Sequence, residues 1–81
     1  MANPVPLSSL KPGDAATIAH FTLSPEIRQR LLELGLTEGT PCEVRRFAPL
    51  GDPLEIRVRN YNLSLRKAEA DGILVTPSAA S

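Results

Sequence analysis

The chain has 81 residues, and its nine lysines and arginines balance its nine aspartates and glutamates. This length suits one small domain with a marginal core, and the balanced charge creates no overall field that would attract nucleic acid or an anionic membrane. One cysteine cannot form an internal disulfide, and no apolar stretch approaches the roughly 20 residues of a membrane span, so we expect a soluble cytoplasmic domain.

The two ends of the chain lack any apolar pattern. Residues 1–6 contain two prolines and residues 76–81 are mostly small and polar, so we expect flexible ends around a single domain at 7–75. The N-terminal residues also lack the basic and apolar regions of a signal peptide. A turn at Lys11–Asp14 leads into a strand over Asp14–His20, which is indicated by imperfect alternation of apolar residues.

The strongest helix signal begins at Ser24–Glu26. The serine can cap the helix, the proline fits the first helical position, and the glutamate favours the positive end of the helix dipole. An apolar stripe at helical spacing follows, formed by Ile27, Leu31 and Leu34. Gly35 is placed to end the helix in a left-handed conformation, with Leu36 folding back onto Leu31.

The rest of the chain favours short strands separated by turns. Strands are expected over Cys42–Phe47, Leu54–Arg59 and Ile73–Val75, with a hairpin over Arg57–Leu65 and up to two helical turns within Ser64–Asp71. About five short strands with one inserted amphipathic helix and a second short helical turn predict a mainly β fold, a small barrel.

The paired glycines do not form a phosphate-binding loop. Gly35 and Gly39 follow a helix, where the negative end of the dipole repels phosphate, and no lysine comes after them. The sole histidine also leaves little scope for activating a nucleophile. We therefore expect no catalytic residue, no cofactor and no enzymatic activity.

Two residues, Cys42 and His20, are candidate ligands for a transition metal. Such a site needs three or four protein ligands at recurring spacing, and the chain has neither a Cys-x-x-Cys nor a His-x-x-x-His pattern. The alternative interpretation is a buried cysteine within a strand and a histidine on the surface.

Seven of the nine basic residues are arginines, and several come in local pairs. Arg45 with Arg46, and Arg57 with Arg59, can dock on an acidic partner or can form cross-strand ion pairs on a solvated face. Leu50 lies in a turn, where it can pack over the end of the barrel or stand exposed as a docking anchor. These five residues are the candidate partner-binding residues.

Four segments of the chain carry a family resemblance that covers residues 7–75, namely Leu10–Gly13, Arg30–Thr40, Ala48–Leu54 and Leu63–Ala70. Together they resemble the FeoA family, small cytoplasmic proteins of bacterial ferrous-iron transport. The resemblance implies an SH3-like barrel with an inserted helix. It also implies an accessory role through contact with the cytoplasmic GTP-binding domain of the FeoB transporter, so that the membrane is reached only through that partner.

Two other functions stay open at this point. One is direct binding of a transition metal through Cys42, His20 and carboxylates. The other is a stand-alone SH3-like module that binds a peptide or a nucleic acid, although the shortage of aromatic residues and of excess basic charge disfavours it.

Overall fold

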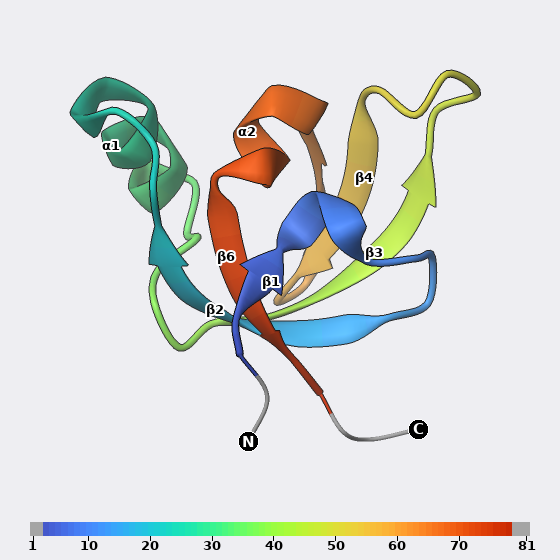
Figure 1. Ribbon diagram of the computed structural model, residues 1–81, viewed down its shortest axis with the longest axis horizontal. Helices are drawn as coiled ribbons and strands as arrows, with labels where there is room; N and C mark the ends of the chain where they lie inside the picture. Colours follow the sequence, from blue (N-terminus) through green and yellow to red (C-terminus); the bar gives the residue numbers. More distant parts are fainter. Residues whose placement is uncertain (1–2, 79–81) are drawn as a thin grey trace.

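In the computed structural model, which describes residues 3–78, six strands and three helical segments form one curled layer around a core (Figure 1). The elements in chain order are β1 (Val5–Pro6), the 3-10 helix η1 (Leu7–Ser9), β2 (Ala15–Phe21), α1 (Pro25–Glu33), β3 (Pro41–Phe47), β4 (Leu54–Val58), β5 (Tyr61–Leu65), α2 (Lys67–Asp71) and β6 (Ile73–Pro77). Neither α1 nor α2 has the length and apolar character of a membrane-spanning helix, and no other helix in the described residues has them.

The strands form a single antiparallel sheet with the order β1-β6-β2-β3-β4-β5. Within residues 3–78 the sheet does not close, so β1 and β5 are its two edges. The mainly β fold with one inserted helix and one short second helix is confirmed. The sheet has six strands rather than about five, and it is an open curl rather than a closed barrel.

The additional strand is β1, in which Val5 pairs with Val75 and Pro6 with Leu74. Residues 5–6 and 76–77 therefore lie in paired strands, where the sequence predicted flexible ends. The physical reason is a non-local one, because β6 supplies the backbone partners of β1 and Val5 packs against the core. The domain bounds of 7–75 stay a prediction, and residues 1–2 and 79–81 lie outside the described part of the chain.

Helix α1 begins and ends as its sequence predicts. The Ser24 hydroxyl accepts a hydrogen bond from the backbone N–H of Ile27 at 3.5 Å, and Pro25 is the first helical residue. Gly35 takes φ of +96°, which lets the N–H of Leu36 donate to the Leu31 carbonyl at 3.0 Å. This is the expected Schellman ending of the helix.

The core fills the inside of the curled sheet. It consists of inward side chains from the strands together with five residues that lie outside the strands: Leu7, Leu10, Leu31, Leu36 and Ala70. Leu31 is fully buried, Ile27 is half-buried, and Leu34 is 39% exposed. The apolar stripe of α1 is thus wider than the surface that the core covers.

Candidate docking surface

The two candidate metal ligands, Cys42 and His20, lie in different environments. Cys42 is 5% exposed and points into the core, where its backbone neighbours are Ala16 and Val58. His20 is exposed opposite Leu74, because a register shift between Ile18 and His20 turns it away from the core. At the usual rise per residue, His20 lies about 13 Å along β2 from Ala16. Residues 3–78 contain no group of three or more histidine, cysteine and carboxylate side chains that could hold a metal ion.

Burial decides the chemistry of Cys42. Loss of solvation raises the pKa of the Cys42 thiol to about 11, so the thiol stays protonated at neutral pH. The thiolate is the form that binds metals and reacts with electrophiles.

We therefore expect iodoacetamide at neutral pH to modify Cys42 only as fast as the protein opens, as measured by mass spectrometry. The urea-unfolded protein, which should react at once, is the control, and rapid stoichiometric labelling of the folded protein would contradict this prediction.

Two of the candidate arginines are engaged in ion pairs. Arg46 Nε lies 3.0 Å from Glu55 Oε1 across the β3–β4 pair, and Arg45 Nη1 lies 3.5 Å from Glu43 Oε1. These pairs are solvent-exposed, and pairs of this kind contribute about 0.2–1 kcal/mol. Because these ion pairs are weak, Arg45 and Arg46 can each exchange the present carboxylate for a carboxylate of a partner at little cost in free energy.

The other two candidates, Arg57 and Arg59, form no ion pair within the described residues. The predicted strand over Leu54–Arg59 is one residue too long, because β4 ends at Val58 and Arg59 lies in the turn with φ of +56°. In this turn Arg59 Nε lies 4.0 Å from the position that a Cβ on Gly35 would occupy. Arg59 therefore stands beside the C-terminal end of α1, whose dipole favours a positive charge.

Leu50 is the most exposed large apolar residue in the described part of the chain, at 96%. It lies at the tip of the β3–β4 loop, residues 48–53, which Figure 1 shows projecting from the sheet. Backbone hydrogen bonds from Gly51 to Ala48 (2.7 Å) and from Ala48 to Pro53 (2.9 Å) shape this loop. Leu50 does not pack over the end of the sheet, so of the two predicted alternatives the exposed position is the correct one.

The five candidate residues do not form one continuous patch. Leu50 precedes β4 and Arg59 follows it, and the five residues of β4 span about 17 Å at the usual rise. A partner that touches both must therefore contact the whole length of the β4–β5 hairpin.

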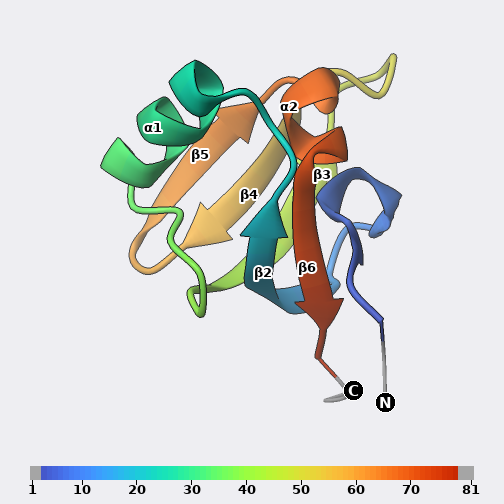
Figure 2. The same cartoon turned by 60° about the vertical axis from the view of Figure 1, so that its left-hand side comes forward.

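A groove that the sequence did not predict lies between α1 and β5, two elements that Figure 2 shows lying close together. This α1/β5 groove has a volume of about 620 Å³ and is lined by Arg30, Leu31, Leu34, Asp52, Pro53, Ser64, Leu65, Arg66 and Glu69. Asp52 and Pro53 belong to the β3–β4 loop, so Leu50 lies next to one end of the groove. The only sequence signal for this groove was the third residue of the apolar stripe, Leu34.

Polar contacts hold the walls of the groove together. Arg30 on α1 forms an ion pair with Glu69 on α2, and the Tyr61 hydroxyl on β5 donates to the carbonyl of Leu34. Glu69 also accepts from the N–H of Arg66 at 3.2 Å. Asp52 accepts from the N–H of Lys67 at 3.0 Å. Both carboxylates of the groove are thus satisfied by groups of the chain itself.

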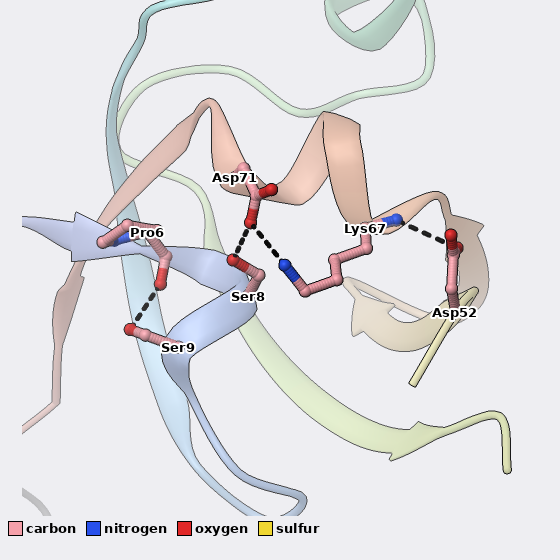
Figure 3. A network of polar contacts seen from close by, with 6 residues as sticks. All are labelled: Pro6, Ser8, Ser9, Asp52, Lys67 and Asp71. Atoms are coloured by element: carbon pink, nitrogen blue, oxygen red, sulfur yellow. Dashed lines mark hydrogen bonds and ion pairs between the residues drawn. The ribbon is translucent and has the colours of Figure 1, made fainter. Parts of the chain in front are cut away.

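Asp71 joins α2 to η1, as Figure 3 shows. The Ser8 hydroxyl donates to Asp71 Oδ1, and Lys67 Nζ lies 3.5 Å from the same oxygen. The Ser8 hydrogen bond, together with the charge of Lys67, holds the pKa of Asp71 below its ordinary value, although partial desolvation opposes the shift.

This pKa shift predicts how the stability responds to acid. A carboxyl group with a lowered pKa in the folded state stabilises the fold above its unfolded pKa and loses that contribution as the pH falls through its folded pKa. We expect the urea concentration at the unfolding midpoint to decrease as the pH is lowered below about 4, the ordinary pKa range of aspartate. This loss should be smaller in Ser8→Ala and smaller again in Asp71→Asn. The same acid dependence in Ser8→Ala and in the parent would show that the hydrogen bond does not shift this pKa.

The sequence matches the FeoA domain family over residues 5–77. It is 38% identical, over 78 residues, to the Fe(2+) transport protein A/Fe(2+) transporter FeoB fusion protein of Porphyromonas gingivalis strain W83. That match covers 93% of this chain but 9% of the fusion protein.

Two solved structures of similar proteins share the fold. The FeoA-like protein of Clostridium acetobutylicum is 30% identical with a TM-score of 0.90, and the match covers 100% of this chain and 94% of that one. The FeoA protein of Chlorobium tepidum is 43% identical with a TM-score of 0.88, covering 95% of this chain and 73% of that one. These structures confirm the mainly β, SH3-like architecture with an inserted helix that the family resemblance implied, although the sheet of this chain does not close within residues 3–78.

Proposed function

Because the chain belongs to the FeoA family, we propose that it is a non-enzymatic cytoplasmic accessory protein of bacterial ferrous-iron uptake. It acts by direct contact with the cytoplasmic GTP-binding domain of a FeoB-type transporter. The observation that carries this proposal is the fusion protein of P. gingivalis, whose name joins an iron transport protein A and a FeoB transporter in one chain. Two functions that are fused in one organism are often performed by interacting proteins in another.

The surface chemistry supports a role in contact. Cys42 is buried with a protonated thiol, which disfavours the alternative of a metal carrier that uses this residue. In contrast, Leu50 presents a nearly complete leucine side chain to solvent, and Arg57 and Arg59 form no ion pair within residues 3–78. Arginine is enriched at protein interfaces, and an exposed apolar side chain such as that of Leu50 gains free energy when a partner buries it.

The contact residues in this proposal are the five that the sequence singled out. Leu50 is the apolar anchor, Arg57 and Arg59 meet carboxylates of the partner, and Arg45 and Arg46 exchange their present carboxylates for those of the partner. Since exposed ion pairs are weak, this exchange costs little.

A titration of the isotopically labelled protein with the FeoB GTP-binding domain tests the proposal. We expect progressive amide shift changes with saturation in the micromolar range, and no such changes with an unrelated GTP-binding domain of similar charge. Spectra that stay constant up to high micromolar concentrations of the FeoB domain would refute the proposed function.

A further inference from the structure

The two edges of the sheet differ in their capacity to accept another strand. The β1 edge is two residues long, contains Pro6, which has no N–H to donate, and continues at once into η1. The β5 edge is five residues long, Tyr61–Leu65, and contains no proline. Of the two edges, only β5 offers a row of backbone groups to a partner.

The register shows which backbone groups of β5 are free. Val58 pairs with Tyr61 across a two-residue turn, and the pair that closes such a turn exchanges both backbone hydrogen bonds. Hydrogen-bonded and non-hydrogen-bonded pairs then alternate along the ladder. The N–H and C=O groups of Asn62 and Ser64 therefore point away from β4, and both residues are exposed.

The α1/β5 groove lies where an added strand would run. Ser64 lines it, Leu34 at the C-terminal end of α1 gives it an exposed apolar side chain, and its volume of about 620 Å³ lies within the range of known ligand clefts. A strand that pairs with β5 would lie about 4.8 Å from it, with alternate side chains facing α1. A helix and an edge strand together thus provide both a backbone template and an apolar contact.

The charges around this edge select the kind of segment that fits. The carboxylates of Asp52 and Glu69 are already hydrogen-bonded within the chain. In contrast, Arg59 before β5 and Arg66 after it form no ion pair in the described residues, and neither does Arg57, which lies opposite Asn62. The free charge along β5 is therefore positive, and its complement is a segment that carries carboxylates.

From these observations we infer that an extended acidic segment of the partner binds along β5 as an additional strand, in the groove between β5 and α1. Its backbone pairs with Asn62 and Ser64, its apolar side chains contact Leu34, and its carboxylates meet Arg66 and Arg59. The inference rests on the proposed function, since the partner is the FeoB GTP-binding domain, and it adds where and how this partner binds.

A second copy of this chain fits the same edge poorly. Antiparallel pairing of two β5 strands about a two-fold axis at Leu63 would place Arg66 of each copy opposite Asn60 of the other and next to its Arg59. Arg66 of one copy and Arg59 of the other would then form two clusters of positive charge, and repulsion between such neighbouring charges is unfavourable. The charges thus favour an acidic partner over self-association.

The test uses the full chain and the FeoB GTP-binding domain. We expect the amides of Asn62 and Ser64 to exchange rapidly with D₂O in the free protein and to become protected in the complex. Arg66→Glu should weaken binding at least tenfold, and the matched charge reversal Arg28→Glu on an exposed position of α1 outside the groove should change it less than threefold. Ser64→Pro, which removes an N–H that β4 does not use, should also weaken binding at least tenfold.

The outcomes separate the two proposals. Binding without protection of Asn62 and Ser64, or with equal effects of Arg66→Glu and Arg28→Glu, overturns the β5 inference and leaves the proposed function intact. No binding at all overturns both. If Ser64→Pro does not fold, as judged by its thermal melting, the exchange measurement on the unaltered protein decides.

Discussion

Replacing Leu31 with alanine is expected to lower the free energy of unfolding by about 2–5 kcal/mol, the usual cost of removing a fully buried leucine side chain. A domain of this size has a total stability of about 4–12 kcal/mol, so the loss is a large fraction of the whole. Leu31 is the only fully buried side chain of α1. Urea unfolding measures the loss, and hydrogen exchange should show the amides of α1 losing protection before those of the sheet.

Leu34→Ala is the matched control, because Leu34 lies three residues further on, at the C-terminal cap of the same helix, but is 39% exposed. We expect this variant to lose less than about 1 kcal/mol, in line with its partial exposure. Equal losses in Leu31→Ala and Leu34→Ala would mean that the two leucines contribute equally to the core, contrary to the burial described above.

Replacing Leu50 with glutamate is expected to weaken binding to the FeoB GTP-binding domain at least tenfold, or about 1.4 kcal/mol, with little change in stability. An apolar anchor that becomes buried on binding contributes strongly to affinity, and a buried glutamate adds a desolvation penalty. In the free protein Leu50 has few neighbours to lose, so the unfolding free energy should change by less than about 0.5 kcal/mol. Isothermal titration calorimetry and thermal melting measure the two effects.

Thr76→Glu supplies the control for charge. It makes the same change of net charge at an exposed position of β6, whereas Leu50 lies in the β3–β4 loop. Similar losses of affinity in the two variants would indicate a general electrostatic effect, and Leu50 would then not be an anchor.

The sequence predicted those parts of the fold that depend on neighbouring residues. The cap at Ser24, the proline at the start of α1 and the left-handed Gly35 all act within a few residues of the chain, so their physics is visible in the order of amino acids. The alternation of Leu54, Ile56 and Val58 likewise predicted a half-buried strand, and all three are fully buried in β4.

The features that the sequence did not reveal depend on distant parts of the chain. Val5 belongs to a strand only because β6 passes beside it, and the register shift between Ile18 and His20 arises in the pairing of β2 with β6. The surface position of His20 was one of the two alternatives that the sequence left open. The α1/β5 groove exists because α1 comes to rest with Leu34 beyond the core. A helical stripe predicts which face of a helix is apolar, but where that face ends on the sheet is decided by the tertiary structure.

The pairing of β1 with β6 brings residues near the two ends of the domain side by side, with Val5 opposite Val75. Figures 1 and 2 both show the start of β1 and the end of β6 on the opposite side of the molecule from the β3–β4 loop. A covalent tether at either terminus would therefore leave Leu50 and the neighbouring groove unobstructed. A short flexible tether gives an effective concentration in the millimolar range, so a contact with a Kd of about 100 μM would be mostly formed in a fused chain. The same contact between separate chains would be governed by their cellular abundance, and expression level would then set how much complex exists.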